Sequence, residues 1–343
     1  MMPAHVRAAF EAQGKACTSL DSPFMGTLMD LCANRDWPDS AVTDRVRHWK
    51  GDLGHRAQSV PLRLAGALHA LVLNGHPGLG AVYPPHPVDH GLLWAAISAA
   101  LIEHAGFIDA FIDNPPQTNE VRRSAALIAV GHFLAEHYDL PIRTSELGAS
   151  GGLNLHWDSY ALQAAGQLRG PDNPVLTLAP DWSGPALPVV SPRVLSRGGV
   201  DINPLDPSQE GDALRLQAYL WPDQPERLAL TRAAIGAAVT RVDKGDAITW
   251  LTPRLPHQSG TLHLIYSTIA WQYFSREKQE EGAAAIAAAG ACATDDTPLA
   301  WFGMEQDDAG RGAALTLRLW PDAITLDLGR ADFHGRWFDW RPL

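Results

Sequence analysis

The stretch IRTSELGASGGLNLHWDSY, residues 142–160, decides the fold. It begins with a β-favouring run, residues 142–147, and continues into the small-residue turn Gly-Ala-Ser-Gly-Gly, residues 148–152. We expect a strand, this turn and a helix over 152–166, because small residues let the backbone approach a ligand and a helix N-terminus offers free N–H groups. The pattern is typical of a nucleotide-binding turn, whose candidate cofactor-binding residues are Gly148, Ser150, Gly152 and Asn154.

Glu146 stands two residues before the first glycine of this turn. A carboxylate at that place would repel a pyrophosphate, but it suits the positively charged amino-acid moiety of S-adenosylmethionine. An ordinary tight turn between a strand and a helix explains the same residues equally well.

Two further acidic residues follow later candidate strands. Asp201 comes at the end of the run 189–202, where a carboxylate could hold a ribose diol. Asp246 follows the run that includes Arg241 and Val242, at the place where a carboxylate would meet the adenine amine. Each alone is explained as a turn or cap residue, but in this order they form a candidate cofactor site with Glu146.

A fourth feature is the run 262–267, which ends in Ser267 and is followed by Trp271 and Tyr273. Ligands of open α/β sheets lie outside the carboxyl ends of the strands. The hydroxyl is therefore a further cofactor-binding candidate, and the aromatic residues could stack on adenine or face a substrate. Packing of Trp271 between helix and sheet is an equal alternative.

The whole chain divides near residue 140. Residues 1–139 predict helices only, and three of them are expected over 60–75, 92–107 and 118–138. From residue 140 to 343, strands alternate with helices, which indicates an α/β fold with a doubly wound, mostly parallel, Rossmann-like sheet. The expected strands cover 142–147, 175–179, 189–202, 261–267 and 298–305, the expected helices 152–166, 209–220, 225–238 and 276–289. A closing antiparallel hairpin is predicted over 313–329, and an insertion over about 160–200.

Composition narrows the class of protein. The 343 residues carry a formal net charge of −11, which disfavours a nucleic-acid binder. The three cysteines are far apart and predict neither disulfides nor a thiolate metal site. The N-terminus lacks the apolar core of a secretory signal, and the apolar run 92–102 is too short for a bilayer. We therefore expect a cytoplasmic protein whose partner is a small molecule, with no membrane association.

Polar residues outside the α/β part complete the candidate site. Gln117 and Asn119 lie between two apolar helices, where helix capping explains part of the cluster. The helical part could close over the pocket and select the substrate with these two side chains, and His334, after the final hairpin, is another substrate-facing candidate. His86 and His90 are four residues apart, but prolines bracket the first, so no metal site is predicted.

The turn also matches G-x-S-x-G, the nucleophile elbow of α/β-hydrolases. Asp295 or Asp296 and then His334 would supply the order Ser…Asp…His, with Ser150 as nucleophile. Against this alternative, Glu146 would place a charge in a strand that is normally apolar, and no oxyanion loop is evident upstream.

Ordered segments across nearly the whole chain resemble a bacterial domain-of-unknown-function family, DUF2332. They include LRLAGALHALVLNG, QTNEVRRSAAL, SELGASGGLNLHWDSY, GVDINPLD, LWPDQPERL, GDAITWL, YSTIAWQYFS and ADFHGRWFDW. Over about 140–330 this family is similar to class I S-adenosylmethionine-dependent methyltransferases. The resemblance implies a methyltransferase for a small molecule or, alternatively, a non-catalytic ligand-binding protein on the same fold.

The same resemblance implies roles for individual residues. Glu146 and the glycine turn would hold the cofactor, Asp201 its ribose and Asp246 its adenine. The middle Ser150 in place of glycine and the insertion over 160–200 depart from the methyltransferase pattern.

Overall fold

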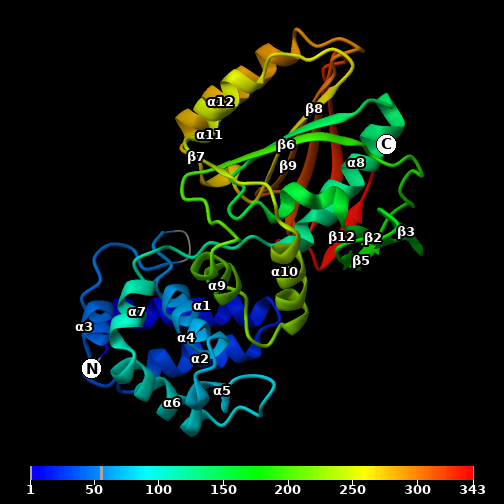
Figure 1. Ribbon diagram of the computed structural model, residues 1–343. Coiled ribbons are helices and arrows are strands. Elements are labelled where there is room, and N and C mark those ends of the chain that lie inside the picture. Colours follow the sequence, from blue (N-terminus) through cyan, green and yellow to red (C-terminus); the bar gives the residue numbers. More distant parts are fainter. Residues whose placement is uncertain (1, 55–56, 343) are drawn as a thin grey trace. The chain divides into compact units, whose positions relative to one another are not determined.

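The computed structural model describes residues 2–54 and 57–342, which fold as two compact units (Figure 1). The helical unit combines Met1–Thr118 with Glu210–Ala229, and the α/β unit combines Asn119–Gln209 with Leu230–Leu343. These units differ from the expected division at residue 140 in two places. The segment from Asn119 to Tyr138 groups with the sheet, and a second segment of chain returns to complete the helical unit.

The helical unit is a bundle around one apolar core. The first expected helix, 60–75, is confirmed as α4, but the second, 92–107, is two helices, α6 and α7, bent by 88°. No single described helix is long and apolar enough to cross a bilayer, and α6 and α7 reach that length only as this bent pair. The helices are α1 (Ala4–Ser19), α2 (Pro23–Asn34), α3 (Ala41–Arg47), α4 (Val60–Leu73), α5 (Pro77–Gly80), α6 (His90–Glu103), α7 (Ala105–Phe111), α9 (Glu210–Ala218) and the start of α10 (Pro225–Ala237).

The segment that returns to this unit contributes to its core. Tyr219 is buried, with its ring centroid 5.7 Å from that of Phe111, and a Cβ at Gly66 would lie 2.5 Å from the same tyrosine ring. Asp223 accepts hydrogen bonds from the Ser22 hydroxyl at 2.5 Å and the Phe24 N–H at 2.9 Å, at the start of α2. The bundle is therefore incomplete without residues 210–229.

The α/β unit is built on a nine-stranded sheet with the order β5-β12-β11-β10-β9-β8-β1-β6-β7. Strands β1, β6, β7, β8 and β9 are mutually parallel, and β10 and β11 are the predicted antiparallel hairpin, which is thereby confirmed. The strands of the large sheet are β1 (Ile142–Leu147), β5 (Asp181–Ser183), β6 (Val194–Asp201), β7 (Asp243–Lys244), β8 (Leu262–Thr268), β9 (Leu299–Gln306), β10 (Ala313–Trp320), β11 (Ile324–Ala331) and β12 (Trp337–Trp340).

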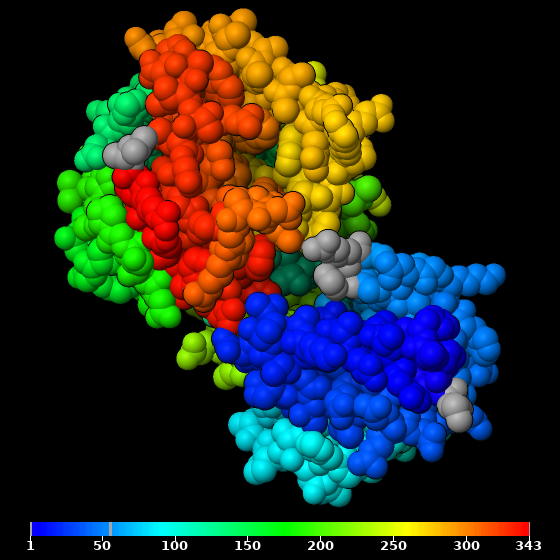
Figure 2. Space-filling model, turned by 180° about the vertical axis from the view of Figure 1, so that it is seen from behind, coloured from blue at the N-terminus to red at the C-terminus, as the bar shows by residue number. Residues whose placement is uncertain are grey.

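Helices cover both faces of this sheet. Successive side chains along a strand point to opposite faces, so the core that each one joins shows which face it occupies. In β8, Leu264 and Tyr266 join the core under α8, whereas Ile265 joins the core under α11 and α12. Figure 2 shows the C-terminal strands, coloured orange to red, at the surface of this unit. The helical segments are η1 (Val121–Arg123), α8 (Ser124–Tyr138), η2 (Leu153–Ser159), α11 (Ala247–Leu251), η3 (Thr252–Arg254), η4 (Trp271–Tyr273) and α12 (Arg276–Gly290), where η denotes 3-10 geometry.

The helix expected over 152–166 is wrong. A 3-10 segment, η2, covers Leu153–Ser159, and the chain then forms β2 (Ala161–Ala164). Trp157 is fully buried, and a Cβ at Gly131 of α8 would lie 2.4 Å from its ring. Tertiary packing of this side chain therefore overrides the helix propensity of the segment. The insertion continues as β3 (Gln167–Arg169) and β4 (Thr177–Leu178), which pair with β2 in a small separate sheet.

Candidate functional site

The glycine turn between β1 and η2 closes on backbone of β6. The N–H groups of Gly148 and Ala149 both donate to the carbonyl of Val200, at 2.9 and 3.0 Å. Gly152 donates to the carbonyl of Ala149 at 2.8 Å within the turn. Three of the six N–H groups from residue 148 to residue 153 are thereby bonded to the protein backbone.

The other three N–H groups of the turn donate to side chains. Ser150 donates to Asp201 Oδ2 at 2.9 Å. Gly151 and Leu153 donate to Asn119 Oδ1, at 3.1 and 2.9 Å. Asn119, a predicted substrate-facing residue, holds the turn through its Oδ1, and each N–H group from residue 148 to residue 153 donates to a protein acceptor.

Protein contacts also explain why the turn needs small residues. Gly148 has φ +79°, and a Cβ there would lie 2.4 Å from Ala270 Cβ. A Cβ at Gly152, whose φ is +74°, would lie 2.9 Å from Val242. Both positions thus require glycine for backbone conformation and for close packing, so the tight-turn interpretation accounts for them without a ligand.

Glu146 is the most buried acid of the candidate set, with an exposed fraction of 2%. It faces the α8 side of the sheet, where the Tyr266 hydroxyl donates to its Oε2 at 3.4 Å. Burial raises the pKa of Glu146 well above its usual range, the charge of Asp201 adds to this rise, and the Tyr266 bond and the Arg123 charge oppose it. A cation placed beside this carboxyl would favour its ionised form.

Asn154 lies in the same buried region but binds protein groups. Its Oδ1 accepts from the Ser124 hydroxyl at 2.8 Å, and its Nδ2 donates to the Glu120 carbonyl at 3.4 Å. Together with Asn119, it joins the segment 119–124 to the glycine turn. The polar cluster around residue 119 is therefore part of the architecture of the turn.

Asp201 and Asp246 follow adjacent strands at the same edge of the sheet. Asp201 also accepts from the Asn203 N–H at 2.9 Å, so both of its carboxylate oxygens are engaged. Asp246 caps α11 by accepting from the Thr249 N–H at 2.9 Å, and it pairs with Lys278 at 3.3 Å. Hydrogen bonds from Thr249 lower the pKa of Asp246, which stays ionised.

Ser267 faces the opposite side of the sheet from Glu146. Its hydroxyl donates to Glu305 Oε1 at 2.8 Å, and the Ala270 and Trp271 N–H groups donate to the same carboxylate at 3.2 and 3.1 Å. Burial raises the pKa of Glu305, and these hydrogen bonds oppose the rise. Glu305 was not predicted, because an acid in the run 298–305 is not distinguishable from a solvent-facing strand residue in the sequence.

A cavity of about 250 Å³ opens beside this carboxylate. Its walls include Trp271 and Trp301, whose ring centroids are 5.1 Å apart, and Arg318, whose guanidinium lies 4.7 Å from the Trp301 ring. Tyr273, the other predicted aromatic, is 68% exposed and is not among the lining residues. Of the aromatic pair, Trp271 therefore lines this cavity and Tyr273 does not.

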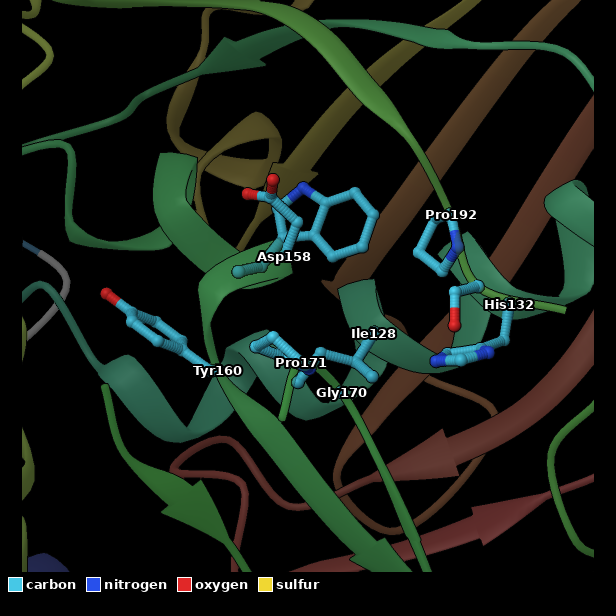
Figure 3. Close-up of a pocket in the computed structure, with 9 residues that line it drawn as sticks. Ile128, His132, Asp158, Tyr160, Gly170, Pro171 and Pro192 are labelled. Atoms are coloured by element: carbon cyan, nitrogen blue, oxygen red, sulfur yellow. The ribbon is translucent and has the colours of Figure 1, made fainter. Parts of the chain in front are cut away.

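A second cavity, of about 150 Å³, lies between α8, η2 and the insertion (Figure 3). His132 lines it, and its Nδ1 is 2.8 Å from the Val190 carbonyl. Burial lowers the pKa of His132, so the imidazole is neutral near pH 7. The other lining residues are Ile128, Trp157, Asp158, Tyr160, Gly170, Pro171, Ser191 and Pro192, none of which was predicted.

The two remaining candidates are His334 and Gln117. The His334 N–H donates to Asp332 Oδ1 at 2.9 Å in the turn after β11. Although burial raises it, hydrogen bonds and the charge of Arg336 lower the pKa of Asp332 to about 2. Gln117 is partly buried and precedes Thr118, the last residue of the first segment of the helical unit.

Comparison with protein-family models matches residues 7–340 to the family described as "Uncharacterized protein conserved in bacteria (DUF2332)". The chain belongs to this family. No curated protein matches it.

The hydrolase triad is not assembled in this DUF2332 chain. Ser150 has φ +54°, as a nucleophile elbow requires, but its buried hydroxyl makes no hydrogen bond among the described residues. Asp296 bonds Ser259 and Gly260, at the amino end of β8, whereas Ser150 follows the carboxyl end of the parallel strand β1. The two therefore lie about one strand length apart, roughly 20 Å.

Proposed function

We propose that the α/β unit is an S-adenosylmethionine-dependent methyltransferase that acts on a small molecule. The observation that carries the proposal is the place of the glycine turn in the sheet. If the parallel strands β1, β6, β7, β8 and β9 are numbered 1 to 5 in chain order, their order across the sheet is 3-2-1-4-5. The direction in which the chain adds strands therefore reverses between β1 and β8. Ligands of doubly wound sheets bind at this switch point, and the turn follows directly after β1.

The charges around the turn support a cationic rather than an anionic ligand. A pyrophosphate needs free N–H groups at a glycine turn, but those of residues 148–153 are all bonded to protein acceptors. Acids lie at or just beyond the carboxyl ends of three adjacent strands instead: Glu146 next to the end of β1, Asp201 at the end of β6 and Asp246 after β7. The sulfonium and ammonium groups of S-adenosylmethionine supply the positive charge that such a set attracts.

The reaction would be an in-line displacement at the sulfonium methyl group. The acceptor atom forms a bond to the methyl carbon while the carbon–sulfur bond breaks, and its electron pair stays on the sulfur of S-adenosylhomocysteine. The protein contributes mainly orientation and exclusion of water, and an acceptor that is already nucleophilic needs no general base. Glu146 would bind the ammonium group, and Asp246, which stays ionised, would accept from the adenine amine.

Isothermal titration tests cofactor binding with matched variants. We expect one S-adenosylmethionine per chain and no binding of NAD⁺. Glu146→Gln keeps the shape of the side chain and removes its charge, so it should weaken binding at least tenfold, about 1.4 kcal/mol. Glu136→Gln, at an exposed site on α8, is the control and should bind as the wild type does. A folded protein that binds no S-adenosylmethionine at millimolar concentration would refute the proposal.

Formation of S-adenosylhomocysteine tests transfer separately from binding. The loaded protein is incubated with a fractionated pool of bacterial small molecules, and the product is measured by mass spectrometry. Product formation that is lost in Glu146→Gln supports a methyltransferase. Binding without product in any fraction would instead favour the non-catalytic alternative. Labelling of Ser150 by a fluorophosphonate would favour the hydrolase.

A further inference from the structure

Three potential metal ligands gather in the helical unit, outside the proposed cofactor site. His76 precedes α5, Glu103 is the last residue of α6, and His104 occupies the corner between α6 and α7. One ligand atom from each residue lies within 4.8 Å of the other two. The two imidazole rings meet edge to face with centroids 4.7 Å apart.

Two of these side chains have no competing partner. Among the described residues, no hydrogen bond or ion pair engages the Glu103 carboxylate or the ring nitrogens of His104. Both histidines are partly buried, while the carboxylate is exposed. The cluster is thus accessible to a dissolved ion, and its two imidazoles are partly shielded from solvent.

We propose that His76, Glu103 and His104 bind one Zn²⁺ ion. Two imidazoles and one carboxylate form a ligand set that zinc takes in proteins, with water in the fourth position. Nitrogen ligands disfavour Mg²⁺ and Ca²⁺, which prefer oxygen only. Atoms within 4.8 Å of one another reach bonding distances of about 2.0–2.2 Å to a central ion by small side-chain rotations. The ion joins the start of α5 to the corner between α6 and α7.

The state of His76 supplies a readout that is independent of activity. Its Nδ1 accepts a hydrogen bond from the Leu79 N–H at 3.1 Å, so the neutral ring carries its proton on Nε2. A metal at Nδ1 takes the lone pair that Leu79 uses, and a metal at Nε2 moves the proton onto Nδ1. In either case the Leu79 N–H loses its acceptor when zinc binds.

Titration of Zn²⁺ into tag-free, metal-stripped protein, against a competing chelator, measures the site. We expect one ion per chain, no binding of Mg²⁺, and faster hydrogen exchange at Leu79 in the loaded protein. His104→Ala should weaken binding at least 100-fold and Glu103→Gln about tenfold, by loss of one ligand each. Neither side chain has a hydrogen-bond or ion-pair partner among the described residues, so both variants should keep the wild-type circular dichroism.

His86→Ala is the matched control, since this exposed histidine lies outside the cluster. It should bind zinc as the wild type does. Equal zinc affinity in the wild type and His104→Ala overturns the proposal, as does the absence of binding by the wild type at about 100 µM zinc. Unchanged exchange at Leu79 in a zinc-loaded protein overturns the participation of His76.

Discussion

Glu146 shows how a single buried acid can limit the stability of the folded protein as the pH rises. Burial raises its pKa above the unfolded value of about 4.5, so the folded state holds a proton that the unfolded state releases first. This stabilisation is complete below the unfolded pKa and is lost as the pH rises toward the folded pKa, by up to about 1.4 kcal/mol per pH unit. The negative charge that would bind a cationic cofactor therefore destabilises the folded protein when no cofactor is bound.

Glu146→Gln should accordingly remove this pH dependence. From pH 5 to pH 8 the free energy of unfolding of the wild type should fall relative to that of the variant, because only the wild type must ionise a buried carboxyl. Urea unfolding at several pH values measures the difference, with Glu136→Gln as control. Parallel curves for the wild type and Glu146→Gln would contradict the assignment.

His263 is a second buried titratable residue, and its contribution to stability depends on pH in the opposite direction to that of Glu146. Burial and the charge of Arg143 lower its pKa to about 3, and its ring bonds Ser145 at 2.9 Å. The unfolded state binds a proton below about pH 6.5 that the folded state does not. The contribution of His263 to stability is therefore present above that pH and is lost as the pH falls.

His263→Gln should flatten the stability curve on the acid side. Between pH 6 and pH 5 the wild type should lose about 1 kcal/mol more than the variant. Chemical unfolding at each pH measures this difference, and His90→Gln, at an exposed position, controls for loss of a histidine. Equal losses in the wild type and His263→Gln would show that the buried ring is not neutral.

At the scale of elements, the glycine turn depends on a residue from outside the sheet. Asn119 accepts from two N–H groups of the turn and is 5% exposed. Asn119→Ala should cost about 2–5 kcal/mol, because two buried donors lose their acceptor. Denaturant unfolding measures this cost, and Asn173→Ala, at an exposed loop position, should change stability little. A cost below about 0.5 kcal/mol would mean that water replaces the side chain.

The elements that the sequence predicted are those with a strong local pattern. The runs at 142–147 and 262–267 became strands with little change of bounds, because each is a short β-favouring run followed by a turn, and each is buried almost throughout. The helix over 152–166 failed because Trp157 packs against α8, and that partner is remote in sequence. The same reason hid Glu305 of β9, because its donors, the Ala270 and Trp271 N–H groups, follow the neighbouring strand β8 and are remote in sequence.

For the candidate site, the sequence placed acids at the ends of strands but did not show which protein groups bond them. Asp201 does follow a strand beside the turn, yet its oxygens bond the Ser150 and Asn203 backbone. Asp246 does follow the next strand and caps α11. A sequence pattern can place an acid at the end of a strand. The hydrogen bonds that its carboxylate oxygens make to protein groups then decide whether those oxygens can bind a ligand.

At the scale of the whole molecule, the helical unit needs its second segment. A fragment of residues 1–139, the domain expected from the sequence, lacks Tyr219 and Asp223, which complete the core and bond the start of α2. We expect this fragment to be helical but without cooperative unfolding, and a peptide of residues 207–229 to restore it. Thermal unfolding followed by circular dichroism checks this, and cooperative unfolding of the fragment alone would contradict it.

The interleaved order of the two units also has a consequence for synthesis on the ribosome. Residues 1–118 leave the exit tunnel well before residues 210–229 are translated. At about 5–20 residues per second, the missing helices follow roughly 5–20 s later. During that interval the nascent bundle exposes the apolar surface that Tyr219 later covers. We therefore expect ribosome-associated chaperones to bind the first third of this chain during synthesis.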